Sequence, residues 1–178
     1  TIINSNIINV FDKLDVSGTG INFTNGYIGI SQDTTTGPIR IGNAAGNSGQ
    51  GNHSVAIGNN AGQIDQGNGT IAIGRNAGYT SQLSNGVAIG YAAGYTGQKM
   101  GSVAIGQNAG YTTQGGNSVA IGIGAGNSSQ GDSSVAIGQR AGNASQGSES
   151  VAIGYNTVCA HDYSVALGKE ATTTASNQ

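Results

Sequence analysis

Few residues of this sequence carry chemistry, and their densest group is the run Cys159-Ala160-His161-Asp162. A thiol, an imidazole and a carboxylate are side chains that bind zinc. One such run supplies too few ligands by itself, whereas three copies arranged around an axis would supply enough. The other interpretation is a chemically inert turn, and we favour it. No metal or cofactor is therefore expected, and Cys159 and His161 are weak candidates only.

The sequence does not predict an enzyme. Besides His161 the chain has one other histidine, His53, and neither lies in a setting that suggests a catalytic triad. Serine is abundant, but no serine stands near a group that would activate it as a nucleophile.

Three tyrosines, Tyr79, Tyr95 and Tyr111, follow one another at intervals of 16 residues. If the chain coils with this period, they occupy one place in three consecutive coils and form an aromatic ladder. An exposed ladder could stack against the sugar rings of a host glycan. Packing of the rings on one another, or on a neighbouring chain, is the alternative that we favour. These tyrosines are the candidate ligand surface.

The element that must position these residues is a repeated phrase, Ser-Val-Ala-Ile-Gly, as in residues 54–58. Its closing glycine returns every 16 residues, and once after 14. The closing glycines are Gly42, Gly58, Gly74, Gly90, Gly106, Gly122, Gly138, Gly154 and Gly168. A constant period of this size indicates one small unit stacked on copies of itself.

Each unit predicts two short strands. The period of two in a strand places Val55 and Ile57 on one face and Ala56 on the other, and the density of glycine excludes a helix. A second glycine four residues later predicts a corner, and the strand after it ends on glutamine. We expect this glutamine, and the residue two before it, to face inward, with the amides hydrogen-bonded along the axis as a ladder. The glutamines are Gln50, Gln66, Gln82, Gln98, Gln114, Gln130 and Gln146.

The fold predicted is all-β, a parallel β-solenoid with two short strands in each 16-residue coil. Residues 38–170 would form about nine coils, and residues 1–37 an N-terminal cap or connector of β type. Residues 171–178 would be a tail leading to a downstream module of a longer protein.

Such a coil has a thin core, because the chain has 33 glycines, two phenylalanines and no tryptophan. The small apolar area buried hardly offsets the entropy of ordering the backbone, so we expect an oligomer wound around a common axis. In this interpretation the branched residues fill the coil and the alanine face receives the other chains. The alanines of this predicted interface are Ala56, Ala72, Ala88, Ala104, Ala120, Ala136 and Ala152.

Composition also excludes several partners. The six basic residues are scattered, which does not predict a surface for nucleic acid. No apolar run is long enough for a transmembrane helix, so no direct membrane insertion is expected. A single cysteine excludes a disulfide within the chain.

The motif Ser-Val-Ala-Ile-Gly-x-x-Ala, whose copies extend from about Ile39 to Gly168, resembles the head repeat of trimeric autotransporter adhesins, the YadA-like heads. The array of repeats in this chain is also similar to arrays in tail and surface fibres of phages and large DNA viruses. The resemblance implies a homotrimer of left-handed parallel β-rolls that carries adhesion. This chain departs from the family in its 16-residue period, and only its last unit has the 14-residue spacing closer to the family unit.

The resulting hypothesis is a structural segment of a trimeric fibre on a cell surface or virion, serving attachment to a host. Its partners would be two further copies of itself and a glycan or protein receptor. Alternatives are a pure spacer without a ligand, or a glycan- or ice-binding solenoid. For ice binding, Thr80, Thr96 and Thr112 are too few. The motif leaves open whether the protein is bacterial or viral.

Overall fold

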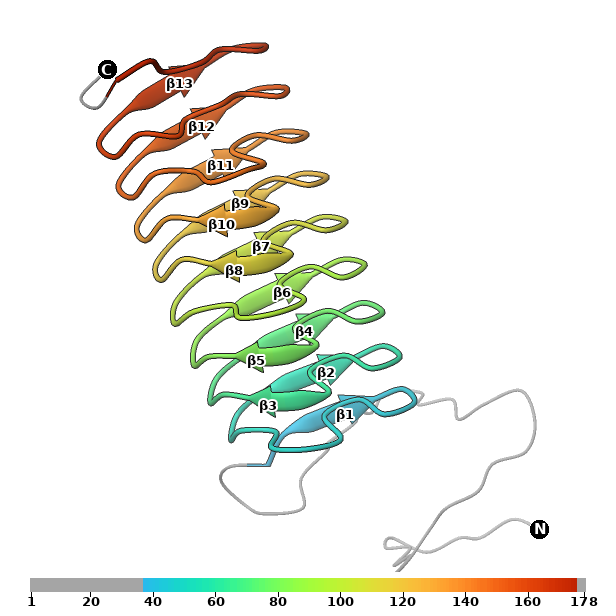
Figure 1. Cartoon of the computed structure of the whole chain (residues 1–178). Coiled ribbons are helices and arrows are strands. Elements are labelled where there is room, and N and C mark those ends of the chain that lie inside the picture. The colour runs from blue at the N-terminus through green and yellow to red at the C-terminus, as the bar shows by residue number, and fades with distance from the viewer. Residues whose placement is uncertain (1–36, 176–178) are drawn as a thin grey trace, which may run out of the picture. The chain divides into compact units, whose positions relative to one another are not determined.

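The computed structural model describes residues 37–175, and they form a parallel β-solenoid (Figure 1). The predicted N-terminal segment, residues 1–37, lies almost wholly outside the described residues, as does the end of the predicted tail. Within residues 37–175 every regular element is a short strand, and no helix is present. The prediction of an all-β solenoid is confirmed.

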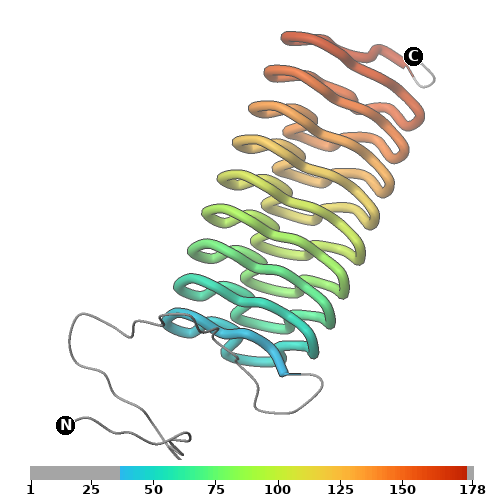
Figure 2. The backbone as a smooth tube through the Cα atoms, turned by 180° about the vertical axis from the view of Figure 1, so that it is seen from behind, coloured from blue at the N-terminus to red at the C-terminus, as the bar shows by residue number. Residues whose placement is uncertain are grey.

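One long sheet of nine strands, one from each coil, forms a continuous wall of the solenoid. The strands pair in parallel and in register, so that Ala56 lies beside Ala72 one coil on. Figure 2 shows the same path repeated from coil to coil. The strands of this sheet are β1 (Ile39–Ile41), β2 (Val55–Ile57), β4 (Ile71–Ile73), β6 (Val87–Ile89), β7 (Val103–Ile105), β9 (Val119–Ile121), β11 (Val135–Ile137), β12 (Val151–Ile153) and β13 (Val165–Leu167).

A second row of strands follows the first along the coils. In it β3 (Ile64–Gln66) pairs with β5 (Thr80–Gln82), and β8 (Thr112–Gln114) pairs with β10 (Ser128–Gln130). Isolated parallel bridges through Thr96 join the two pairs. The predicted two strands per coil are thus present, the second more irregular than the first.

The interior of the coil is filled by alanine, which corrects the predicted orientation of the Val-Ala-Ile strand. The middle alanines are fully buried, whereas the branched residues on either side point outward. The opposite wall explains this choice. A Cβ added to Gly78 would lie only 3.3 Å from the Cβ of Ala72, so the two walls are too close for valine or isoleucine between them.

The second strand also departs from simple alternation. Gln66 is buried as predicted, but Ile64, two residues before it, is exposed. The residue between them, Asp65, has a φ of 54°, and a residue in the left-handed region breaks the period of two. Every full unit has such a residue, with φ between 51° and 70°: Gly49, Asp65, Ser81, Gly97, Thr113, Ser129 and Ser145.

The two glycines of each unit form corners, as predicted. Gly74 has a φ of 125°, and a Cβ there would lie 2.6 Å from the carbonyl oxygen of Gly90 in the next coil. Gly78 has a φ of 53°, and its Cβ would lie 2.5 Å from Oε1 of Gln82. Gly74 requires glycine because of both its backbone conformation and the space, and Gly78 because the buried Gln82 amide leaves little room for a Cβ.

The last complete coil is shorter and simpler. Thr157, Val158 and Cys159 alternate inward, outward and inward, with no left-handed residue among them. Val158 pairs with Thr172, and Thr173 is buried against the preceding coil. The roll therefore continues to Thr173 and passes the predicted boundary at residue 170.

Candidate functional site

The outer face of the nine-stranded sheet is apolar along its whole length. Each strand contributes two outward side chains, which are half-buried in the middle of the sheet and reach 50% exposure at Ile41 and 62% at Leu167. We call this surface the Val/Ile face. Its members are Ile39, Ile41, Val55, Ile57, Ile71, Ile73, Val87, Ile89, Val103, Ile105, Val119, Ile121, Val135, Ile137, Val151, Ile153, Val165 and Leu167. A continuous apolar surface of this kind marks an interaction site.

The predicted trimer interface of alanines is wrong. All of those alanines are inside their own chain, where no second chain can reach them, and each has 0% of its surface exposed. The alanines concerned are Ala56, Ala72, Ala88, Ala104, Ala120, Ala136 and Ala152. The same strands present their opposite, branched face to the outside, so the surface available for association is the Val/Ile face.

The predicted glutamine ladder is present as a row of inward side chains, but its hydrogen bonds differ from the prediction. Nε2 of Gln98 donates to the carbonyl oxygens of Val87 at 2.8 Å and Ser102 at 3.1 Å. The side chain spans the interior, so the nearest acceptor is the backbone of the opposite strand. The same bond, to the carbonyl 11 residues earlier, is formed by Gln50, Gln66, Gln82, Gln98, Gln114, Gln130 and Gln146.

A bond from one amide to the next joins a single pair among the described glutamines. Nε2 of Gln66 donates to Oε1 of Gln82 at 3.3 Å. The glutamines therefore connect the two walls of one coil more than they connect successive coils.

Tyr79, Tyr95 and Tyr111 form the predicted aromatic ladder. Successive ring centroids are 4.9 Å apart, and the ring planes differ by 7° and 6°. The three side chains are half-buried. Burial raises the pKa of the Tyr95 hydroxyl, and the neighbouring Tyr111, Tyr79 and Tyr91 raise it further.

The stacking favours one of the two interpretations of these tyrosines. Both faces of the Tyr95 ring are covered, one by Tyr79 and the other by Tyr111. A sugar that stacks on a ring needs a free face, and only the two outer faces of the ladder remain. The ladder as a whole packs on itself, which is the interpretation that the sequence favours.

A turn beside the ladder carries a cation over an aromatic ring. The guanidinium of Arg75 lies 4.7 Å from the centroid of the Tyr91 ring, a geometry that stabilises both groups. Arg75 and Tyr91 directly follow the closing glycines of consecutive coils.

Cys159 and His161 are placed apart. The thiol of Cys159 is 1% exposed and lies inside the coil, 3.0 Å from Oγ of Ser164. His161 is half-exposed on a turn. A metal shared by three chains would need the sulfur on the outside, and within residues 37–175 no three His, Cys, Asp or Glu side chains converge.

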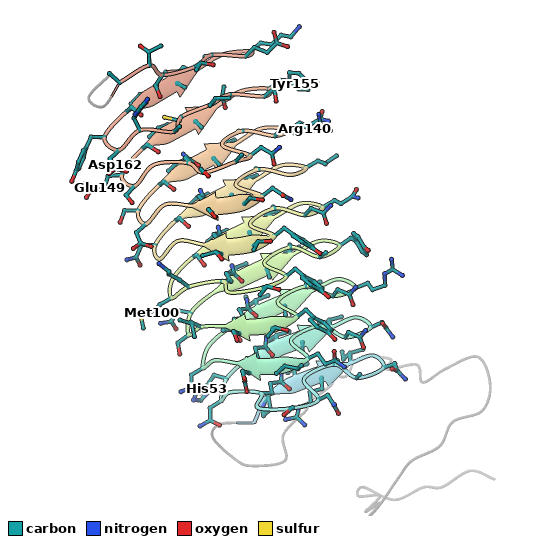
Figure 3. The ribbon with its side chains drawn as sticks, viewed as in Figure 1. His53, Met100, Arg140, Glu149, Tyr155 and Asp162 are labelled. Carbon is teal, nitrogen blue, oxygen red and sulfur yellow. The ribbon has the colours of Figure 1, made fainter. Side chains whose placement is uncertain are left out.

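The other titratable groups are spread along the solenoid. Figure 3 places His53 and Asp162 near opposite ends of it, and Arg140 on the edge away from both. Asp132 accepts the N–H of Gly116 at 2.8 Å, which lowers the pKa of its carboxyl, and the Lys99 ammonium at 3.1 Å lowers it further. These groups form no common centre.

One hollow opens between the turn edge and the second row of strands. It has a volume of about 260 Å³ and is lined by Asn108, Ile123, Gly124, Asn127, Arg140 and Asn143. Asn127 and Asn143 occupy, in the next two coils, the place that the tyrosines occupy in the ladder.

Sequence reasoning missed the buried hydroxyl that precedes the strand. Oγ of Ser102 donates to the carbonyl of Lys99 at 2.6 Å and closes the turn. The signal was a serine or threonine directly before Val-Ala-Ile in most units. The hydroxyls that make this bond are those of Ser54, Thr70, Ser102, Ser118, Ser134, Ser150 and Ser164.

Comparison with known families gives one result. Residues 50–61 and 145–171 match the family model of the YadA head domain repeat, in two copies. The second match covers the 14-residue coil around Cys159. Comparison with curated proteins found no match, and comparison with solved structures found none. Within the described residues no helix is long and apolar enough to cross a membrane.

Proposed function

From the YadA-type head repeats in this chain, we propose that it is a segment of a homotrimeric surface fibre that serves attachment. Three solenoids would associate along the Val/Ile face. This apolar face is the observation that supports the proposal most. The expected location is the outer surface of a cell, and the virion is the alternative. We assign the segment no catalytic role.

Two observations support self-association. The interior of one coil contains alanine methyl groups and polar glutamine and serine side chains, which give little hydrophobic stabilisation. The largest aliphatic side chains of the repeat are on the outer face instead. Burying them against further copies would supply the missing apolar contact, and the YadA-type repeat favours three copies.

The mass in solution tests this proposal. Sedimentation equilibrium of the full chain should give three times the mass of one chain. Ile105→Lys would place a charge in the middle of the Val/Ile face, where burial without a partner costs several kcal/mol. We expect this variant to dissociate.

Gln107→Lys is the matched control, because Gln107 is exposed on the turn two residues away. It adds the same charge and should leave the trimer intact. A folded monomer of the parent chain, or a trimer unaffected by Ile105→Lys, would contradict the proposal.

Attachment itself is a separate question from assembly. Beads coated with the trimer should adhere to host cells above the level of uncoated beads. A trimer that assembles but does not adhere would favour the spacer role.

A further inference from the structure

Within residues 37–175 the tyrosine ladder is the one place where tyrosine rings stack on each other. Successive ring centroids are 4.9 Å apart, and the planes are within 7° of parallel. Parallel bridges from Thr80 to Thr96 and from Thr96 to Thr112 hold the adjoining backbone in register. The solenoid itself therefore keeps these rings side by side, in addition to their mutual attraction.

The other tyrosines of the described residues have no such neighbour. Tyr91, Tyr155 and Tyr163 are exposed to 41%, 43% and 57%, more than the half-buried tyrosines of the ladder. Arg75 and Gln107 occupy the place of Tyr91 in the adjoining coils, and no described tyrosine takes the corresponding place beside the other two. Exposure and ring pairing thus belong to different tyrosines of this chain.

Paired tyrosine rings have a chemistry that a single ring lacks. A tyrosine that gives up one electron and its hydroxyl proton becomes a phenoxyl radical, whose unpaired electron is shared with the ring carbons beside the oxygen. Two such radicals join through a bond between these carbons, and the hydrogen on each joined carbon moves to the oxygen and restores the phenol. Rings held next to each other react in this way more readily than rings that meet by diffusion. Rotation of each ring about its soft χ2 torsion brings the carbons together.

We propose that the ladder is a site of oxidative cross-linking, in which Tyr95 forms a carbon–carbon bond with Tyr79 or Tyr111 and so joins two consecutive coils. The oxidant is hydrogen peroxide, used by a haem peroxidase. One peroxide takes two electrons and two protons from two tyrosines and leaves as two molecules of water, so the chain loses two hydrogens. Tyr95 is a member of every pair because it alone stacks on both of the others.

Such a bond would do what a disulfide cannot do in this sequence. The chain has one cysteine, Cys159, and its thiol is free and buried. A bond from Tyr95 to either neighbour joins residues 16 positions apart, and a cross-link of this length restricts the unfolded chain. No tyrosine of the ladder belongs to the Val/Ile face, so the proposal does not depend on the proposed trimer.

Treatment of the full chain with hydrogen peroxide and a haem peroxidase tests the proposal. Dityrosine fluorescence should appear, and mass spectrometry after trypsin locates the bond. A bond between Tyr95 and Tyr111 joins the peptides 76–99 and 100–140, whereas one between Tyr79 and Tyr95 leaves peptide 76–99 lighter by two hydrogens. Free tyrosine treated in parallel shows that the oxidant is active. If free tyrosine couples and these peptides stay unchanged, the proposal is overturned.

Variants separate pairing from exposure. Tyr95→Phe keeps a ring in the middle of the ladder but removes the hydroxyl, and Tyr79 and Tyr111 are then separated by a ring that cannot form the radical. Both cross-links should fall to the level of untreated chain. Tyr155→Phe is the matched control, because it removes an exposed tyrosine outside the ladder and should leave both cross-links unchanged. Circular dichroism confirms that each variant is folded. A cross-link that persists in Tyr95→Phe, or is lost in Tyr155→Phe, would overturn the proposal.

Thermal unfolding tests whether the bond joins folded coils. The cross-linked chain should unfold at a midpoint roughly 5–10 °C above that of the untreated chain, as for other cross-links that close a short loop. Tyr95→Phe treated in the same way should show no such gain. Equal midpoints for the cross-linked and the untreated chain would contradict a bond between neighbouring coils of the folded solenoid.

Discussion

The residue in the middle of the second strand has a backbone conformation that most side chains avoid. Gly49 and Gly97 adopt it at no steric cost, whereas Asp65, Ser81 and Thr113 adopt it with a side chain. A left-handed conformation costs an ordinary residue roughly 1–2 kcal/mol. Thr113, which is β-branched and has a φ of 51°, has the least suitable side chain of the series.

Thr113→Gly should therefore stabilise the protein. Relief of the left-handed strain outweighs the entropy that glycine loses on folding, and we expect a gain of about 1 kcal/mol. The midpoint of thermal unfolding, followed by circular dichroism, measures it. Thr112→Gly, one residue earlier in an extended conformation, is the control and should lower the midpoint. A lower midpoint for Thr113→Gly would contradict the strain argument.

The tyrosine ladder should make stability depend on alkaline pH. The pKa of Tyr95 is raised in the folded chain, first by burial and then by its tyrosine neighbours. The unfolded chain therefore loses this proton first, at about pH 10, and the free energy of unfolding should fall as the pH rises further. Thermal midpoints between about pH 8 and 11 test this.

Tyr95→Phe keeps the stacked ring and removes the titrating hydroxyl. Its midpoint should decline less over the same pH range than that of the parent chain. Parallel declines would show that the ladder does not contribute to the pH dependence.

The coil depends on glycines, and their positions differ sharply in whether they tolerate a side chain. Gly74 touches the backbone of the next coil and has a φ of 125°. Gly116 lies on a turn with no left-handed φ, and a Cβ there would meet only an ordinary contact at 3.6 Å. Two residues of one type thus have opposite importance.

Gly74→Ala should destabilise the solenoid by several kcal/mol, because the methyl group would meet the Gly90 carbonyl oxygen at 2.6 Å. Gly116→Ala should be neutral or slightly stabilising, since alanine restricts the unfolded chain. Urea denaturation of both variants measures the difference. Equal effects would contradict the close approach seen at Gly74.

At this scale the sequence predicts the strands, the glycine corners and the inward glutamine, because each depends on a local rule. It does not predict which face of Val55-Ala56-Ile57 points inward. That choice depends on how closely the opposite wall approaches, which is a property of the closed coil. The left-handed Asp65 did have a local signal, since glycine occupies the same place in other units at Gly49 and Gly97, but the period of two predicts an extended residue there.

The candidate site divides in the same way. The spacing of Tyr79, Tyr95 and Tyr111 predicts their stacking, since equal offsets meet in a parallel stack. The hollow next to Asn127 was not predicted, because it arises from small residues in two separate parts of the coil, Gly124 on the turn and Asn127 before the strand.

In the whole molecule, identical positions lie beside one another through residues 37–154. Val87 pairs with Val103, and Val103 with Val119, always 16 residues on. Each coil therefore presents to its neighbour nearly the same backbone groups as the coil before it. The contacts between coils depend on the register and little on which coil is involved.

Removal of residues 115–130, one full repeat, should leave a folded solenoid that is one coil shorter. Gln114 would then precede Gly131, as it now precedes Gly115. The same residues of every strand would still point inward. Removal of residues 115–129 is the control. It shifts the following strands by one position and would turn Ala136 outward. Circular dichroism and thermal unfolding should show a cooperative transition for the first deletion and its loss for the second.

Most connections between the walls and between the coils use groups that do not change charge. Two exceptions are the carboxylates of Asp132 and Asp162, which accept the N–H of Gly116 and of Ser148 in the preceding coil. Amides, hydroxyls and backbone carbonyls make the internal hydrogen bonds, and within residues 37–175 the one ion pair, Lys99 with Asp132, lies on the surface with side chains 48% and 60% exposed. Such a pair contributes little and is weakened by salt. The solenoid should therefore keep its shape from fresh water to brine and through mild acid. A surface protein held together in this way keeps its structure in surroundings whose salt or acidity would weaken a protein held together by ion pairs.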